Sequence, residues 1–217
     1  MIIQGQGQVD RQTQTKEAIF NAAMRLFSEK GYSATTVRQI AGMSGVGLSS
    51  VYWYYTNKEA MLNEILTTFQ HKIEGYLVTS EQADHYIETD TPRQLLERYC
   101  PHFQREEAGF MMMAFRIVYM EQFTNSIARD IIVGQFHHKT VESIRYVLDL
   151  LIQRGKIPAY DTAYLAELWA QTKFYDAVIL MHRIADGQAA EEAVWEFMFN
   201  DRMVDVALTG KVPKIQV

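Results

Sequence analysis

The stretch from residue 35 to residue 58 restricts the possible folds of this chain more than any other part of its sequence. It reads as two short helices separated by Gly45, which can adopt the positive φ angle that lets the second helix cross the first steeply. The second helix presents small polar and aromatic side chains, in the run Ser49-Ser50-Val51-Tyr52-Trp53-Tyr54-Tyr55. Such a pair of helices is typical of a helix-turn-helix, whose second helix enters the major groove of DNA.

A helix with one apolar face precedes this stretch. From Thr15 onward, apolar residues recur at helical spacing, and Gly31 stands where a C′ glycine ends a helix. We expect Thr35 to cap the next helix. The residues expected to form a small core are Ile19, Ala22, Ala23, Leu26, Phe27, Val37, Ile40, Ala41, Val46 and Val51. Residues 1–10 are rich in Gln and Gly, and we expect them to be mobile.

The rest of the chain is also helical in pattern. A long helix carries Leu62, Ile65, Leu66, Phe69, Ile73 and Leu77 on one face. The polar residues 79–91 are interpreted as a loop. Further helices are expected from Pro92, from Gly109 to about 123, and over about 126–154, 161–184 and 190–208. The predicted fold is all-α: an N-terminal three-helix helix-turn-helix domain and a C-terminal helical bundle.

The charge distribution favours a small DNA-facing module on a body that stays off DNA. The chain has 217 residues and a formal net charge of −5, which argues against a non-specific nucleic-acid binder. Residues 1–65 nevertheless carry six basic and five acidic side chains, so the negative excess lies in the remainder. Contacts with bases and dimerisation would therefore have to supply much of the affinity for DNA.

Other features of the sequence indicate the cellular compartment. The single cysteine, Cys100, excludes a disulfide within the chain and fits a reducing environment. The N-terminal residues lack the pattern of a secretion signal. The apolar run at Phe110–Phe115 is much shorter than the roughly 20 residues of a membrane span. We expect a cytoplasmic protein without membrane association.

The first third of the chain resembles the DNA-binding domain of the TetR family of transcriptional regulators. The resemblance covers about Thr13 to Ile73 without a gap. It depends on an apolar first helix, then Leu26-Phe27, Gly31, Thr35-Thr36, Ile40-Ala41, Gly45-Val46, Tyr52, Tyr55 and Lys58-Glu59. It implies a DNA-binding domain over residues 13–73, with the motif at 36–55. Residues 74–208 would then form the ligand-binding and dimerisation domain, which such regulators keep in helical plan but not in sequence.

The resemblance also implies which residues contact DNA. Leu48, Ser49, Ser50 and Trp53 match positions that face base edges or sugars. Positions that hold phosphates are matched by Tyr52, Tyr54 and Lys58, and in the preceding helix by Thr36 and Arg38. Hydroxyl and cationic groups would fix the register on the backbone, while the groove-facing groups read the sequence.

Two residues depart from the family pattern. Gly47 replaces the usual Ser or Thr before the recognition helix, so a side-chain N-cap is missing at a cost of a few tenths of a kcal/mol. Leu48 stands where many relatives have a polar or basic residue, which favours contact with thymine methyl groups. Tyr55 is interpreted as a core aromatic, whereas Trp53 has no apolar stripe to join and is expected to face the groove. Tyr52 keeps two interpretations, a phosphate contact or a core aromatic ring. Arg38 also keeps two, a phosphate contact or an ion pair with a nearby carboxylate.

A cluster of flexible methionine and aromatic side chains in the second domain suggests a ligand site. Methionine and aromatic side chains between residues 111 and 123 can repack around varied apolar ligands, although a plain hydrophobic core explains them as well. The resemblance favours a sensor in which a small molecule between the helices moves the linking helix. The candidate ligand-binding residues are His102, Met112, Phe115, Arg116, Tyr119, Phe123, His137, Tyr175 and His182.

The last two expected helices carry more apolar residues than one bundle face needs. The residues are Tyr164, Leu168, Trp169, Tyr175, Val178, Ile179 and Met181, with Val194, Trp195, Phe197, Met198, Met203 and Val206. We interpret them as a homodimer interface of four helices, two from each subunit. A symmetric dimer would place two recognition helices on half-sites about 34–36 Å apart.

The function predicted from these patterns is that of a ligand-responsive repressor. A homodimer would bind a pseudo-palindromic operator in double-stranded DNA, and a small apolar or amphipathic effector would release it. We expect no enzymatic activity, metal or cofactor. The alternatives are a metal-dependent helical-bundle enzyme, suggested by His102 and Glu106 at i, i+4 near His137-His138, and a helical scaffold without DNA binding. No HExxH, CxxC or glycine-rich phosphate loop supports the enzyme.

Overall fold

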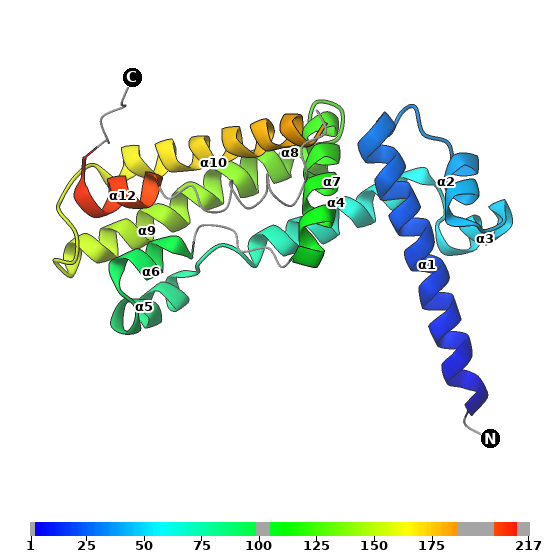
Figure 1. Ribbon diagram of the computed structural model, residues 1–217, viewed down its shortest axis with the longest axis horizontal. Coiled ribbons are helices and arrows are strands. Elements are labelled where there is room, and N and C mark those ends of the chain that lie inside the picture. The colour runs from blue at the N-terminus through cyan, green and yellow to red at the C-terminus, as the bar shows by residue number, and fades with distance from the viewer. Residues whose placement is uncertain (1–2, 99–104, 186–201, 212–217) are drawn as a thin grey trace. The chain divides into compact units, whose positions relative to one another are not determined.

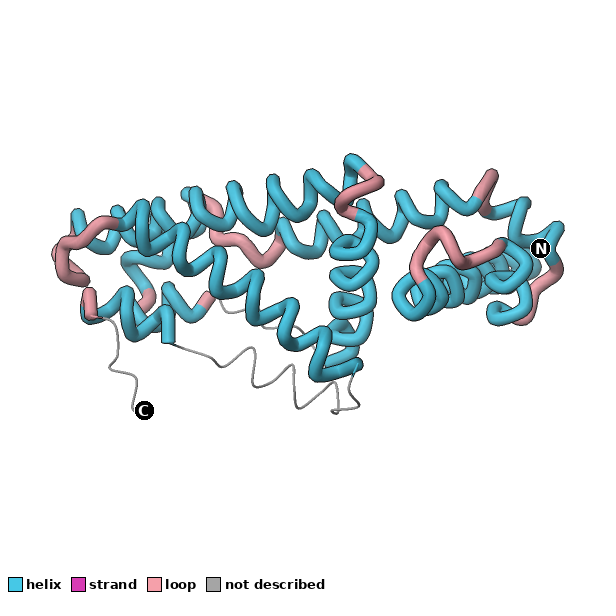
Figure 2. The backbone as a smooth tube through the Cα atoms, turned by 90° about the horizontal axis from the view of Figure 1, so that it is seen from above, coloured by secondary structure: helices cyan, strands magenta, loops and turns pink. Residues whose placement is uncertain are grey.

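The protein is described by a computed structural model that covers residues 3–98, 105–185 and 202–211. Over these ranges every element is a helix and no strand occurs, which confirms the all-α prediction (Figures 1 and 2). Within the same ranges no helix combines the length and the apolar content needed to cross a bilayer.

The chain forms two compact units that do not follow the order of the sequence. Unit 1 contains Met1–Gln70 together with Phe110–Arg129, and unit 2 contains His71–Gly109 together with Asp130–Val217. The sequence pattern suggested a single boundary after residue 73. It did not reveal that a segment 40 residues further along belongs with the helix-turn-helix.

The first four helices belong to unit 1, although the last of them continues into unit 2. They are α1 (Ile3–Lys30), α2 (Val37–Ser44), α3 (Leu48–Tyr54) and α4 (Lys58–Glu74). The expected apolar stripe of α1 is buried, from Ile19 to Phe27, and so are Ile40, Ala41 and Val51. Val37 and Val46 are half-buried. The predicted core of the helix-turn-helix is therefore confirmed, with these two valines at its edge.

The start of α1 and the end of α4 differ from expectation. The first helix begins at Ile3, so the prediction of a mobile N-terminus was wrong. Glutamine is a good helix former, and extending an existing helix costs far less than nucleating one. The helix α4 ends at Glu74, before Leu77, because Gly75 and the following turn interrupt it.

The remaining part of unit 1 comes from α7 (Arg105–Glu121) and α8 (Ser126–Asp130), which enter the unit at residue 110 and leave it after residue 129. The ring of Phe110 stacks on Phe20 of α1, with centroids 6.4 Å apart. Phe115 lies 6.5 Å from Phe69 of α4. The methionine-rich stretch thus supplies core side chains to the unit that carries the helix-turn-helix.

Unit 2 is built from α5 (Ser80–Thr89), α6 (Pro92–Glu97), η1 (Ile131–Lys139), α9 (Thr140–Gln153), α10 (Thr162–Ala185) and α12 (Arg202–Thr209). The interpretation of residues 79–91 as a loop was wrong, because they contain α5. Thr79 caps this helix in a capping box with Gln82, and the buried Ala83 and Ile87 give it an inward face. Pro92 begins α6 as predicted.

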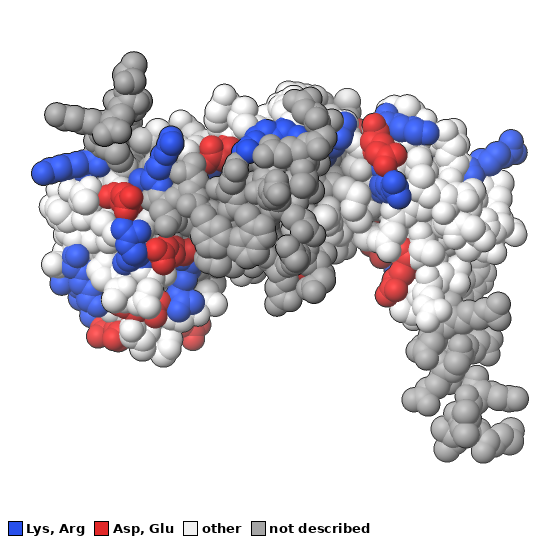
Figure 3. Space-filling model, in the orientation of Figure 1, with Lys and Arg blue, Asp and Glu red and all other residues white. Residues whose placement is uncertain are grey.

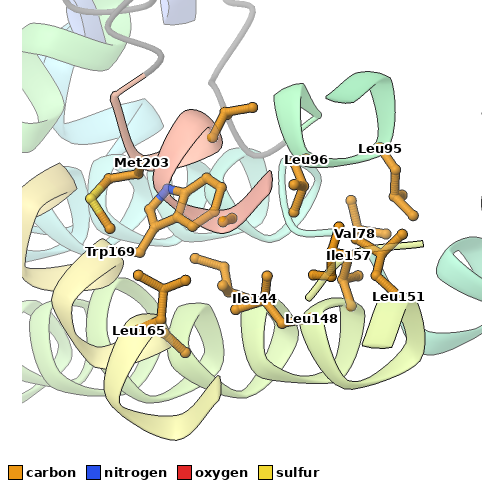
Figure 4. Close-up of a cluster of buried hydrophobic side chains, with 14 of the residues drawn as sticks. Val78, Leu95, Leu96, Ile144, Leu148, Leu151, Ile157, Leu165, Trp169 and Met203 are labelled. Carbon is orange, nitrogen blue, oxygen red and sulfur yellow. The ribbon is translucent and has the colours of Figure 1, made fainter. Parts of the chain in front are cut away.

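The core of unit 2 lies between α9, α10 and the short helices α5, α6 and α12. The helices α9 and α10 lie side by side (Figure 1). Trp169 of α10 is fully buried, beside Leu165 and Met203 (Figure 4). Gly155 takes a φ of 63° and ends the long helix where the sequence predicts it.

The expected helix over 126–154 is continuous but changes its winding. Residues Ile131–Lys139 form a π-helix between α8 and α9. The buried Gln135 donates from its amide to a carboxylate oxygen of Glu74, 2.9 Å away, and the ammonium of Lys139 lies 2.9 Å from the same oxygen. The end of α4 is therefore fastened to η1 within unit 2.

Candidate nucleic-acid interface

The helix α2 begins with a capping box that fixes its start. The N-cap is Thr36, whose hydroxyl accepts a hydrogen bond from the Gln39 N–H, while the Gln39 side chain accepts one from the Thr36 N–H. The prediction of Thr35 as the cap was therefore wrong by one residue. Thr35 is 1% exposed, and its hydroxyl donates toward the carbonyl oxygens of Leu26 and Gly31.

The turn between α2 and α3 depends on Gly45, as the sequence predicts. Its φ is 71°, in the left-handed region, and its N–H donates to the Ala41 carbonyl. The Ser44 hydroxyl donates to the Ile40 carbonyl, 2.8 Å away. The Ile40 and Ala41 carbonyls thus accept local hydrogen bonds at the end of α2, and α3 starts in a new direction.

Only one residue of α3 is buried. Val51 is 0% exposed and anchors the helix on the core of unit 1. The groove-facing candidates Leu48, Ser49, Ser50 and Trp53 are all exposed. Gly47 occupies the N-cap position without a side-chain hydrogen bond, as the sequence predicts.

The aromatic run separates into outward and inward rings. Trp53 is 68% exposed and Tyr52 is 51% exposed. Trp53 meets the half-buried Tyr54 edge to face, with ring centroids 4.6 Å apart. Tyr55 is buried, which confirms its interpretation as a core aromatic, and burial together with the Glu64 carboxylate raises the pKa of its hydroxyl. Consequently Trp53 and Tyr52 are the large rings that α3 offers to a partner.

The predicted phosphate-binding side chains differ in their engagement. Arg38 and Thr36 are exposed on α2, and the Thr36 hydroxyl donates to the Gln39 side chain. The Lys58 ammonium is already engaged, because it donates to the carbonyl oxygens of Tyr32 and Thr35 at 2.7 and 2.8 Å. Which of these residues hold phosphates stays a prediction.

The candidate ligand-binding residues are divided between the two units. Met112, Phe115, Arg116, Tyr119 and Phe123 belong to unit 1, and His137, Tyr175 and His182 belong to unit 2. Phe115 and Tyr119 contact each other with centroids 6.4 Å apart, but Phe123 and Tyr175 are 80% and 63% exposed. His182 is exposed, and His137 lies 3.5 Å from a Glu167 carboxylate oxygen. His102, like Cys100, lies outside the described residues.

Unit 2 has shallow clefts near the end of α4. Two of them measure about 560 and 530 Å³, and polar side chains such as Lys139, Ser143, Gln94 and Arg98 line them. Neither contains any of the residues expected to bind a ligand. Over the end of the unit that carries α5, α6 and α12, acidic and basic side chains alternate on the visible face (Figure 3). The ligand-binding residues therefore stay a prediction.

The apolar residues expected at a dimer interface also divide. Tyr164, Tyr175 and Ile179 are exposed along α10, at 68%, 63% and 40%. Trp169, Met203 and Val206 are buried in the core of unit 2, so their assignment to an exposed face was wrong. Helical spacing alone could not separate the two faces of α10, since both are apolar. Val194, Trp195, Phe197 and Met198 lie outside the described residues.

Comparison with known proteins identifies the helix-turn-helix. Residues 19–65 match the family model of bacterial regulatory proteins of the tetR family, over the helices whose geometry is given above. Over this domain the chain is similar to the TetR family. The prediction made from the residue pattern is thus confirmed.

Relatives agree with the family model. The probable HTH-type transcriptional regulator YttP of Bacillus subtilis is 29% identical over 143 residues, which is 65% of each protein. The HTH-type transcriptional regulator AcrR of Shigella flexneri is 36% identical over 70 residues, or 32% of each. These matches span less than two thirds of either relative. Both proteins are named as transcriptional regulators and neither as an enzyme.

The fold extends the likeness over most of the chain. A TetR-like transcriptional regulator from Rhodococcus sp. RHA1 superposes with a TM-score of 0.60 at 16% identity, covering 91% of this chain and 97% of that one. The helical plan of the second domain is therefore shared, as the sequence resemblance implies, while its residues have diverged.

Proposed function

We propose that this chain is a DNA-binding transcriptional regulator of the TetR family, and specifically a repressor, whose helix α3 enters the major groove. The observation that carries the proposal is the outward face of α3. A 68% exposed tryptophan and exposed serines stand on a helix that buries only Val51. An exposed indole offers apolar surface and an N–H donor to a partner, and a helix of this diameter fits the major groove of B-DNA.

The division of labour on this surface follows from the chemistry of each side chain. Leu48, Ser49, Ser50 and Trp53 lie on the exposed part of α3 and would contact base edges, thymine methyl groups and sugars. Tyr52, Tyr54, Arg38 and Thr36 would hold phosphates and fix the register. The Thr36 hydroxyl would exchange its bond to Gln39 for a phosphate oxygen.

A homodimer is part of the proposal. One short helix reads too few base pairs for useful specificity, whereas two heads on half-sites about 34–36 Å apart read a pseudo-palindrome. The exposed Tyr164, Tyr175 and Ile179 supply an apolar face on α10 that a second copy can cover. The two copies would pair through α10.

An effector would control DNA binding through the relative stability of two states. A small apolar or amphipathic molecule would bind within the second domain, and α4, which runs from the helix-turn-helix into unit 2, would carry the change. Such a ligand shifts the equilibrium only by its differential affinity for the two states. Which residues contact the effector stays a prediction.

The proposal is tested by selecting bound sequences from a random duplex pool and measuring affinity for the selected site. We expect a two-fold symmetric site and salt-dependent binding. Trp53→Ala should lower the affinity at least about tenfold, since losing the contacts of one base pair costs about 1–3 kcal/mol in each half-site. Tyr146→Ala, which removes an exposed ring from α9, is the matched control and should bind like the parent.

Two outcomes would contradict the proposal. Failure to enrich any sequence would favour the helical scaffold. A Trp53→Ala variant with the affinity of the parent would show that α3 does not read the groove.

A further inference from the structure

The side-chain amide of Gln135 is buried in unit 2 with only one of its two ends engaged. Gln135 is 6% exposed, and its amide nitrogen donates to a carboxylate oxygen of Glu74 at 2.9 Å. Its carbonyl oxygen, Oε1, has no hydrogen-bond partner among the residues that the structure describes. An ionised carboxylate only accepts, so the nitrogen must face Glu74 and the two ends of the amide cannot exchange. A buried acceptor without a donor is unfavourable, and such an atom is a place where a ligand can bind.

The helix that carries Gln135 is unusual in its winding. Gln135 lies in the middle of the π-helix η1, and π-helices are rare and frequently occur at functional sites. The backbone carbonyl of Gln135 accepts a hydrogen bond from the Thr140 hydroxyl at 3.0 Å, so only the side-chain oxygen lacks a donor. The preceding residue, Gly134, is half-buried, and a Cβ built there would meet no atom within 4 Å. The space beside this part of η1 is therefore open.

The residues next to Gln135 along η1 are apolar. Ile131 is fully buried, and the ring of Phe136 meets Phe174 of α10 with centroids 6.4 Å apart. Val133 also belongs to this helix. A molecule that reaches Oε1 would therefore lie against apolar surface with a single polar contact, which is the usual composition of a small-molecule site.

The charges around Gln135 decide which kind of donor can pair with Oε1. The negative charge of Glu74 is balanced by the ammonium of Lys139, 2.9 Å from the oxygen that Gln135 also contacts. A cationic ligand would therefore gain little from Glu74 and would lose its hydration. A neutral hydroxyl or N–H group has no such cost. The bond from the amide nitrogen to a carboxylate also polarises the amide, which makes Oε1 a better acceptor.

We infer that Gln135 binds the effector: Oε1 accepts a hydrogen bond from a neutral hydroxyl or N–H group of an otherwise apolar molecule, while the amide nitrogen holds Glu74. The inference rests on the proposed function and deepens it, because it names the chemistry of the effector and the residue that connects it to α4. Glu74 is the last residue of α4. A ligand that draws on the Gln135 amide therefore acts on the side chain that fastens this helix.

The test uses two probes that differ in one hydrogen-bond donor. para-Hexylphenol donates from its hydroxyl, whereas its methyl ether has the same apolar body and no donor. Isothermal titration calorimetry measures the affinity of the full-length protein for each probe. The parent should bind the phenol at least about fivefold more tightly than the ether, because only the phenol supplies a donor to Oε1.

Two variants assign this preference to Gln135. Gln135→Met keeps the length of the side chain and removes the amide, so the two probes should bind within about twofold of each other. Gln153→Met changes an exposed glutamine at the end of α9 and, as the matched control, should keep the preference of the parent. The side-chain amide signals that disappear from the NMR spectrum in Gln135→Met identify Gln135, and the phenol should shift them more than the ether does. Gln135→Leu takes the same role if Gln135→Met does not fold.

Glu74→Met separates binding of the probe from its effect on α4. Oε1 of Gln135 is still present in this variant, so the preference for the phenol should remain. The phenol should lower the affinity of the parent for the DNA selected from the random pool at least about fivefold, and that of Glu74→Met by less than about twofold.

Several results would overturn the inference. They are failure of the phenol to bind the parent, equal affinity of the parent for the two probes, and an unchanged preference in the variants of Gln135. A Glu74→Met protein that releases DNA like the parent would show that Gln135 does not act through α4. If the parent binds no selected DNA, the proposed function fails, whereas the calorimetric comparison of the two probes still decides whether Gln135 binds a donor.

Discussion

The missing N-cap of α3 offers a sharp test of how the sequence shapes this helix. Gly47 has a φ of −67° and a ψ of 149°, which any L-residue adopts without strain. A Cβ added there would meet only the hydroxyl oxygens of Ser49 and Ser50, at 3.8 and 3.9 Å, which is ordinary contact. Gly47→Ser therefore fits the existing backbone.

The expected gain has two parts. A serine oxygen at the N-cap accepts a hydrogen bond from the first turn, which improves on glycine by a few tenths of a kcal/mol. Replacing glycine also removes conformational freedom from the unfolded chain, which contributes about 0.4–1 kcal/mol. Together these give about 0.6–1.4 kcal/mol, or a rise in Tm of about 1–6 °C for a chain of this size.

Gly47→Ala separates the two parts, because it restricts the unfolded chain but supplies no cap. Serine exceeds alanine at an N-cap by about 0.5–2 kcal/mol, so the serine variant should be the more stable of the pair. Urea unfolding gives the global difference, and amide hydrogen exchange in α3 gives the local one. Equal stability of the two variants would refute the reasoning, since the hydrogen bond of the cap would then contribute nothing.

Three other expectations follow from single contacts. Thr35→Val removes a buried hydroxyl that donates to the end of α1, and should lower the free energy of unfolding by about 1–3 kcal/mol in urea titration, while an unchanged midpoint would contradict it. The Lys72 ammonium and the Tyr76 hydroxyl hold the pKa of Glu107 below its usual 4.5. The contribution of Glu107 to the free energy of unfolding is therefore present above that pH and is lost as the pH falls below it. Stability should therefore fall less between pH 5 and pH 3 in Glu107→Gln than in the parent, and parallel losses would disprove this. Tyr175→Glu places a charge on the exposed face of α10 and should weaken self-association in sedimentation equilibrium, unless that face is not the dimer interface.

The helix-turn-helix was predictable because local rules and burial agree there. The apolar stripe from Ile19 to Phe27, the left-handed Gly45 and the buried Tyr55 all follow from spacing and residue type. The cap of α2 was misplaced because Thr35 and Thr36 are adjacent and chemically alike. Only the packing of α1 shows that the first threonine faces inward.

The second unit was less predictable, for two physical reasons. The helix α5 carries mostly polar residues, so its short inward face of Ala83 and Ile87 is too weak a periodic signal to outweigh the loop-like composition. In α10 the opposite occurs, since Trp169 and Tyr175 are both aromatic although one is fully buried and the other 63% exposed. Composition cannot say which side of such a helix the rest of the chain will cover.

The contribution of α7 to unit 1 has a consequence for engineering. The chain passes between the units at residues 70 and 71, 109 and 110, and 129 and 130, and these three crossings lie inside α4, α7 and α8. A head excised as one contiguous fragment would leave Phe20 without its stacked partner and Phe69 without its neighbour from α7. A chimeric regulator that exchanges only residues 1–70 would therefore have a cavity in the core of the transferred domain. Transferring residues 110–129 together with residues 1–70 would keep that core filled.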